Sequence, residues 1–162
     1  MSKVATKIAA RKDAKSAILA AKRERAENAH ADALAYCEAN KIRGTEKAAL
    51  VAFASTAMQP QSDRGAIAKA AFSEGKARVW TFAALAKAAK VSIATLSTAN
   101  LAYIARNVAF RADLVGFSFV ADGEAETVTV RPVKAAKAAP RKAAKGKAAA
   151  PEKAADGSEK AA

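Results

Sequence analysis

The side chains best suited to metal binding or acid–base chemistry in this sequence are His30 and Cys37. They lie seven residues apart, on one face of a predicted first helix. A structural zinc site needs four ligands, and the single histidine completes no Ser/His/Asp arrangement. No glycine-rich phosphate loop of the form GxxxxGK[ST] or GxGxxG occurs. We therefore predict no catalytic residue, no metal site, no cofactor and no enzymatic activity, with His30 on the surface and Cys37 as a small apolar residue.

The chain carries a large excess of positive charge. Its 162 residues include 28 Lys and Arg against 15 Asp and Glu, which gives a net charge of +13. Such an excess favours polyanions, either nucleic acid or an anionic membrane surface. No apolar run is long enough to span a bilayer, and the N-terminal segment lacks the Trp, Phe and Leu of an interfacial helix. We expect double-stranded DNA as the partner, no membrane, and a cytoplasmic, nucleoid-associated protein.

Composition divides the chain into three segments, and any binding residues are positioned by the structure of the segment that holds them. Residues 1–43 are predicted to form a basic, alanine-rich helical arm, whose first 27 residues hold eight cations against three acids, a net +5. This arm is interpreted as a solvated helix, a DNA-contacting arm, or a weak coiled coil that forms a homodimer. Residues 133–162 again hold eight cations against three acids, and this Lys/Ala/Pro-rich tail is predicted to be disordered.

Residues 44–132 contain the larger apolar side chains and are predicted to form the folded domain. Thr45 is a suitable N-cap for the first helix of this domain, and Asp122-Gly123 is a strong hairpin turn signal. The expected elements are helices over 46–58 and 63–72, a strand over 77–81, a helix-turn-helix within 80–97, and a β-hairpin over 116–131 that Pro132 ends. The predicted fold class is mainly α with a small β-hairpin.

The stretch from Leu85 to Ser97 resembles the core of the helix-turn-helix superfamily. Ser92 would cap the second helix, and Lys90 stands where the turn usually carries a left-handed glycine, at a cost of about 1 kcal/mol. The buried seam would consist of Leu85, Ala89, Val91, Leu96 and Ala99. The element order is similar to the winged helix-turn-helix variant over about residues 46–132, which implies that strand 78–81 pairs with the hairpin. Two ordinary packed helices are the alternative.

The resemblance implies a DNA-contacting surface around the second helix of the motif. Ile93, Ala94, Ser97, Thr98 and Leu101 would face outward. The candidate DNA contacts are Lys90, Ser92, Ile93, Thr95, Ser97, Thr98, Asn100 and Arg106. Hydroxyl groups dominate this set, and they contact phosphates better than they discriminate bases. The hairpin tip carries Asp122, Glu124 and Glu126, which would repel phosphates, so we expect it to face solvent or a protein partner.

The basic tail supplies a second set of candidate DNA contacts. They are Lys134, Lys137, Arg141, Lys142, Lys145 and Lys147. In composition the tail is similar to the tails of linker histones and of histone-like bacterial proteins; a solubilising extension is the alternative. Neutralising phosphates releases counterions, so six to eight engaged cations predict a log–log salt slope of roughly −5 to −7.

Together these features predict a non-enzymatic DNA-binding protein of low sequence specificity that coats DNA or associates with the nucleoid. One alternative is a sequence-specific transcription regulator that dimerises through its N-terminal helix. Another is a protein-interaction adaptor that acts on a transcription or translation complex through the acidic hairpin and the core.

Overall fold

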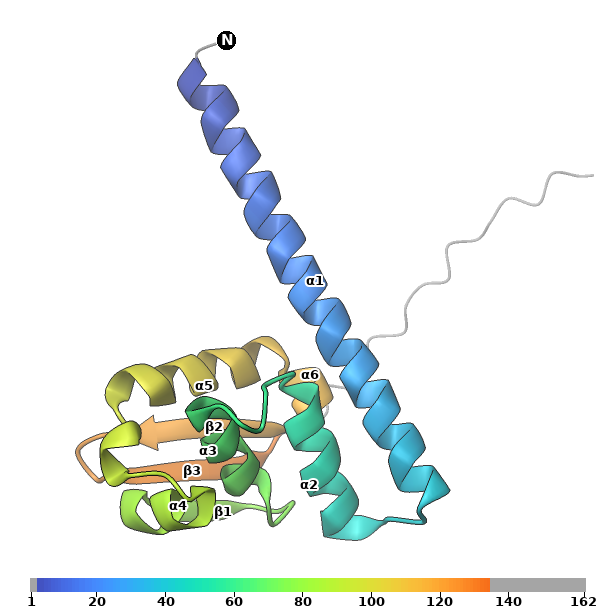
Figure 1. Cartoon of the computed structure of the whole chain (residues 1–162), viewed down its shortest axis with the longest axis vertical. Coiled ribbons are helices and arrows are strands. Elements are labelled where there is room, and N and C mark those ends of the chain that lie inside the picture. Colours follow the sequence, from blue (N-terminus) through green and yellow to red (C-terminus); the bar gives the residue numbers. More distant parts are fainter. Residues whose placement is uncertain (1–2, 135–162) are drawn as a thin grey trace, which may run out of the picture.

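The structure is a computed structural model that describes residues 3–134 (Figure 1). The predicted tail contacts Lys137, Arg141, Lys142, Lys145 and Lys147 lie outside the described residues, and so does nearly all of the segment predicted to be disordered. Lys134 is described and exposed, directly after the last strand.

The described chain is mainly helical, with a small three-stranded antiparallel sheet. The elements are α1 (Lys3–Ala39), α2 (Gly44–Ser55), α3 (Asp63–Phe72), β1 (Arg78–Thr81), α4 (Phe82–Ala89), the 3-10 helix η1 (Ile93–Thr95), α5 (Thr98–Phe110), α6 (Ala112–Val115), β2 (Phe117–Asp122) and β3 (Thr127–Pro132). The predicted fold class is confirmed at this level.

Helix α1 has two parts with different surroundings. Its N-terminal part projects away from the rest of the fold, and its C-terminal part packs on α2 (Figure 1). In the packed part Ala26 and Cys37 are fully buried. His30 is partly buried, with Nδ1 2.8 Å from the Ser55 hydroxyl of α2, so its prediction as a surface residue is wrong. No helix of the described chain is long and apolar enough to cross a membrane.

Helices α2 and α3 are joined by the loop 56–62, which later forms one wall of the candidate site. Helix α2 begins two residues before the prediction and has Arg43, not Thr45, as its N-cap, because the positive φ of Gly44 turns the chain sharply after α1. Helix α3 begins as predicted, and the Ser62 hydroxyl accepts a hydrogen bond from the Gly65 backbone N–H. A Cβ at Gly65 would lie 1.8 Å from the Gln59 carbonyl oxygen, so the loop packs tightly on the first turn of α3.

The sheet has the strand order β1-β3-β2 and buries one of its faces. Alternate residues of the strands point into the core, which is the period of two that β-strands impose. The Phe72 ring of α3 packs 6.0 Å from Phe117 and 6.4 Å from Phe119, measured between ring centroids. Strand β1 pairs with β3, as the winged-helix resemblance implies, and β3 ends at Pro132, as predicted.

The predicted tight turn after α4 is confirmed, but the second helix of the motif starts later than predicted. Lys90 adopts the left-handed conformation, with φ of 57° and ψ of 39°. Ser92 precedes only the short η1 and makes no side-chain cap, whereas Ser97 caps α5 by accepting from the Asn100 backbone N–H. Because α5 starts later, a different side of it faces the core. Leu101 is buried and Ala99 is exposed, opposite to the prediction.

Candidate nucleic-acid interface

The predicted contact residues at the start of α5 lie on the surface, but most of their polar groups are engaged within the protein. The hydroxyls of Ser92 and Thr95 bond each other at 2.9 Å, and the Ser97 hydroxyl caps α5. Asn100 Oδ1 accepts from Arg64 Nε at 2.8 Å, and Asn100 Nδ2 donates to the Thr95 carbonyl at 2.8 Å. Its amide is therefore used to join α3, η1 and α5 and is not free to read a base.

The remaining predicted residues of this surface offer little to a nucleic acid base. Lys90 and Thr98 are exposed, and 55% of the Ile93 side chain is accessible to solvent. A lysine and a hydroxyl suit phosphate contacts, which carry no sequence information. This surface therefore has a limited capacity for direct readout.

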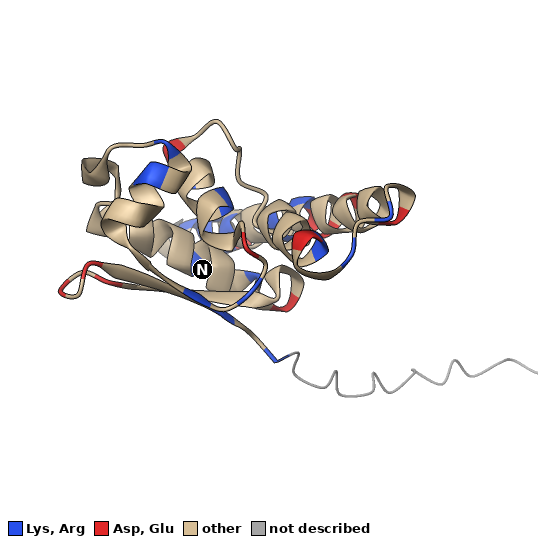
Figure 2. Ribbon diagram, turned by 90° about the horizontal axis from the view of Figure 1, so that it is seen from below, with Lys and Arg blue, Asp and Glu red and all other residues tan. Residues whose placement is uncertain are grey.

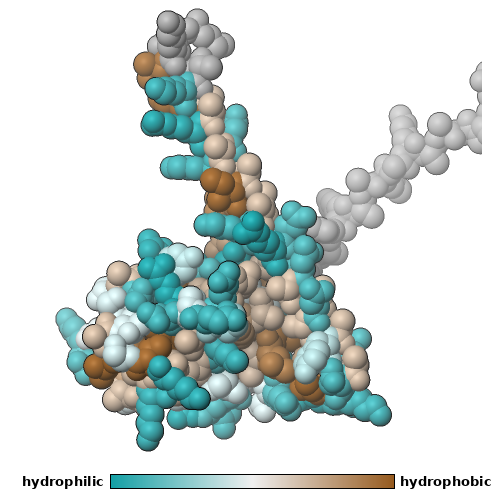
Figure 3. Space-filling view, in the orientation of Figure 1, coloured by the Kyte–Doolittle hydropathy of each residue, from teal (hydrophilic) through white to brown (hydrophobic). Residues whose placement is uncertain are grey.

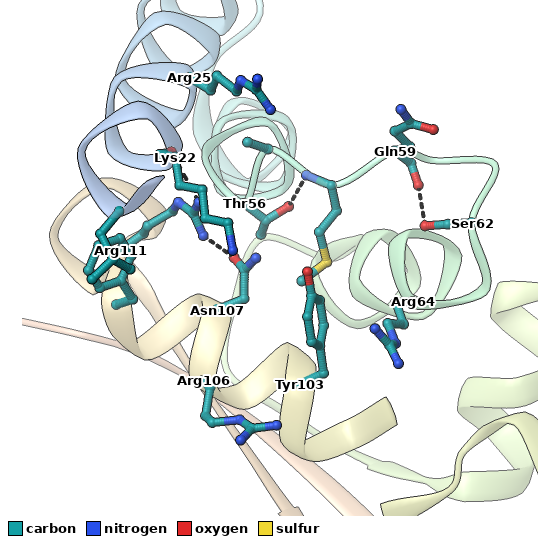
Figure 4. Close-up of a pocket in the computed structure, with 14 residues that line it drawn as sticks. Lys22, Arg25, Thr56, Gln59, Ser62, Arg64, Tyr103, Arg106, Asn107 and Arg111 are labelled. Carbon is teal, nitrogen blue, oxygen red and sulfur yellow. Dashed lines mark hydrogen bonds between the residues drawn. The ribbon is translucent and has the colours of Figure 1, made fainter. Parts of the chain in front are cut away.

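A groove lies beside the start of α5, between α1, the loop 56–62 and α5. This groove has a volume of about 770 Å³, and four exposed cations line it: Lys22, Arg25, Arg64 and Arg106. None of its lining residues in the described part of the chain is acidic. Figure 4 shows Lys22 and Arg25 on α1, with Arg64 and Arg106 on the other side of the space. Of the predicted contacts that the structure describes, Arg106 is the one that lines the groove.

Two buried or half-buried arginines hold α1 in position along the groove. Arg23 donates to both carboxylate oxygens of Asp113 in α6. Arg111 donates to the Lys22 carbonyl at 3.1 Å and to Asn107 Oδ1 at 2.6 Å. The hydrogen bonds from Arg23 lower the pKa of Asp113, and the same contacts raise the pKa of Arg23. These contacts fix the backbone from which Lys22 and Arg25 project.

Arg111 also makes the wall of the groove electropositive. It is 4% exposed, and its Nε has no hydrogen-bond partner among the described residues. Burial lowers the pKa of Arg111, and the positive charge of Arg23 acts in the same direction. No carboxylate of the described chain pairs with it. A buried charge is unfavourable without a counter-charge, and an anion in the groove would supply one.

Aromatic and apolar side chains complete the groove. The Arg64 guanidinium carbon lies 4.2 Å from the centroid of the Tyr103 ring, a cation–π contact that holds Arg64 over α5. Tyr103 and Phe110 are 39% and 43% exposed. Their rings can contact the sugar or base of a bound nucleotide, while the neighbouring cations contact its phosphates.

The opposite charge gathers elsewhere on the domain. Figure 2 shows acidic residues at the tip of the β2–β3 hairpin, where Asp122, Glu124 and Glu126 are all exposed. Asp122 Oδ1 accepts from the backbone N–H groups of Glu124 and Ala125 and so holds the hairpin loop. In contrast, Figure 3 shows hydrophilic side chains over the region where α1 meets the domain. The domain thus has a cationic groove and a separate acidic tip.

Sequence reasoning did not identify Lys22, Arg25, Arg64 and Tyr103 as contacts. Lys22 and Arg25 entered only the net charge of the arm, and neither has a local signal that aims it at a groove. Arg64 and Tyr103 are 39 positions apart in the sequence and meet only through the packing of α3 on α5.

Comparison of the chain with family models finds no match, and neither the curated proteins nor the solved structures include a significant match to it. The resemblance to winged helix-turn-helix proteins therefore depends on the motif residues and the order of elements.

Proposed function

We propose that this chain is a non-enzymatic protein that binds double-stranded DNA with little sequence preference. The observation that carries the proposal is the groove, where four cations from three helices converge without an acidic neighbour. They have no carboxylate partner to release before they bind: the described residues include no ion pair of Lys22, Arg25, Arg64 or Arg106. Each can therefore replace a counterion at a phosphate.

Low sequence preference is supported by what the same surface lacks. Direct readout of bases needs free Arg, Lys, Asn or Gln groups at the groove of the duplex. The amide of Asn100 is engaged on both sides, and the hydroxyls near the start of α5 are bonded within the protein. Lys90 and Thr98 would add phosphate contacts next to the groove. A nucleoid-associated role follows from this chemistry together with the basic tail.

A non-enzymatic role is supported by the state of the two reactive side chains. The sequence contains one histidine and one cysteine. His30 bonds Ser55 in the contact between α1 and α2, and Cys37 is fully buried. Both side chains therefore serve packing.

The test is a binding titration of the full chain against two 30-base-pair duplexes of unrelated sequence over a salt series. We expect affinities for the two duplexes that agree within about threefold and a log–log slope of roughly −5 to −7. An absence of binding at low salt, or a preference of a thousandfold or more for one sequence, would overturn the proposal.

A second full-length variant separates the tail from the folded part. In it the tail cations Lys134, Lys137, Arg141, Lys142, Lys145 and Lys147 are all changed to Gln. If the tail contributes as predicted, the slope becomes less negative, and weaker binding remains through the groove. Complete loss of binding in this variant would remove the groove from the proposal.

A further inference from the structure

Most of the positive charge on the free part of α1 lies on one face, and Lys12 lies about 60° outside it. Lys7, Arg11, Lys15, Lys22 and Arg25 follow each other at spacings of 4, 4, 7 and 3 residues. At about 100° per residue these positions fall within an arc of about 80°. Their side chains are exposed. We call this set the α1 track.

The α1 track continues into the groove. Lys22 and Arg25, at its C-terminal end, line the groove, and Leu19 of the same face lines it as well. The acids Asp13 and Glu27 lie on the opposite face, and Glu27 is paired there with Arg23. Of these three acids Glu24 lies nearest to the track, about 100° outside its edge. Because α1 is one continuous helix, its cations and those of the groove form one electropositive surface (Figure 1).

The arrangement is unfavourable for the isolated helix. Like charges at i and i+4, as in Lys7–Arg11 and Arg11–Lys15, destabilise a helix. Helix α1 has no acidic residue in its first turn, where negative charge would favour the helix dipole. Cations that served only solubility would be as effective on several faces. A polyanion along the track removes the repulsion.

The length of the track matches a stretch of duplex. The 18 positions from Lys7 to Arg25 span about 27 Å of helix axis. A duplex presents about eight phosphates per strand over that length. We propose that α1 is a second DNA-binding surface, an inference that rests on the proposed function. The phosphate backbone of one strand runs along the α1 track into the groove, and the duplex lies between α1 and α5.

The isolated hydrophobic side chains of the free part do not offer an equally good alternative. Ile8 is 51% exposed and stands ten positions before the adjacent pair Ile18 and Leu19, which are 55% and 48% exposed. Figure 3 shows hydrophobic side chains in separate places along the projecting helix. Cations occupy the positions between them, so a second copy of α1 packed on this face would bring like charges together. A phosphate backbone fits both the charge and the spacing.

The experiment moves the charge from one face of α1 to the other in the full chain. The face-swapped variant carries Lys7→Ala, Arg11→Ala and Lys15→Ala together with Ala9→Lys, Ala17→Lys and Ala20→Lys. All six sites are exposed, and Ala and Lys both favour helix. The number of charged residues is unchanged, and the anchors Arg23, Asp113 and Arg111 are left in place. Circular dichroism checks that helix content is retained.

Binding to a 30-base-pair duplex is then compared with the wild-type chain over a salt series. We expect the face-swapped variant to bind at least tenfold more weakly at 0.1 M salt, with a slope less negative by about 2 to 3. We also expect the wild-type chain to require about six or seven more base pairs than the variant for full affinity, because the track of the variant begins at Lys22. If the two proteins have equal affinity, equal salt slope and the same minimum duplex length, the proposal that DNA binds along the α1 track is overturned.

The outcomes separate this inference from the proposed function. If the wild-type chain binds no duplex at low salt, the proposed function fails and the track fails with it. If the wild-type chain binds and the face-swapped variant binds equally well, the track alone fails. If the variant loses binding to anionic vesicles of phosphatidylserine but not to DNA, the ligand of α1 is a membrane surface and the track as stated here is overturned.

Discussion

The start of α5 and the groove beside it differ in what their polar groups are free to do. At the start of α5, Ser92, Thr95 and Asn100 bond partners within the protein. In the groove, Lys22, Arg25 and Arg106 project from fixed helices without a carboxylate partner among the described residues. The first region resembles a recognition surface in sequence, and the second has the available charge. A contact surface is therefore marked by charges without a counter-charge, and residue type alone does not identify it.

The largest effect is expected from neutralising both sides of the groove. In the variant with Arg25→Gln and Arg106→Gln, DNA affinity should fall by about tenfold or more at 0.1 M salt, and the salt slope should become less negative by about 2. The reason is the loss of one phosphate contact from α1 and one from α5. Fluorescence anisotropy on unrelated duplexes measures both values.

The matched control for the groove removes the same charge elsewhere. Arg43 and Lys69 are exposed and do not line the groove. The variant with Arg43→Gln and Lys69→Gln should bind within about twofold of the wild-type chain. An equal loss of affinity in both variants would show that net charge alone controls binding, and the groove would then have no special role in DNA binding.

A smaller effect, on stability and not on binding, is expected at Asn100. Asn100→Ala removes the hydrogen bonds to Arg64 and to the Thr95 carbonyl, and it should lower the free energy of unfolding by about 1–2 kcal/mol. DNA affinity should change by less than about threefold. Chemical denaturation and binding titrations measure the two quantities. Asn28→Ala, at an exposed asparagine of α1 that does not line the groove, is the control that should change neither.

The same variant can also contradict the comparison. If Asn100→Ala binds one duplex sequence much more weakly and another as before, then Asn100 reads a base. The start of α5 would then be a recognition surface after all, and the sequence-specific regulator would become the better function.

The smallest effect is expected at the ion pair that anchors α1. Asp113→Asn should lower the free energy of unfolding at pH 7 by no more than about 1 kcal/mol, because the pair is largely exposed, with 62% of the Asp113 side chain accessible. The pKa of Asp113 is lowered in the folded protein, so the stabilisation is fully present above the unfolded pKa of about 4. It is lost as pH falls through the lower folded pKa.

Denaturation of the wild-type chain and Asp113→Asn at pH 7 and near pH 2 checks this sign. The difference between the two proteins should shrink at the acidic pH. Asp32→Asn removes an exposed carboxylate that has no ion pair in the described chain, and it should give a smaller difference at both pH values. A difference that grew as pH fell would contradict the assignment.

Much of the fold could be predicted from local signals. The start of α3 at Asp63 and the end of β3 at Pro132 follow from residues that act on their own backbone. The left-handed Lys90 is expected from the resemblance to the helix-turn-helix turn and not from the residue itself. The later start of α5 could not be predicted this way, because Ser92 and Ser97 are both suitable caps. The packing of Leu96 and Leu101 in the core, not the local sequence, selects Ser97.

The sequence by itself determined the excess of positive charge, the long first helix and the order of helices and strands, because charge adds without regard to position and helix or strand signals act over a few residues. Only the tertiary structure decided which cations share a surface. Lys22 and Arg106 are 84 positions apart, yet both line the groove. The contacts of Arg23 with Asp113 and of Arg111 with the Lys22 carbonyl hold α1 beside α6 and the end of α5. They join residues 90 and 89 positions apart, and no local signal in the sequence predicts them.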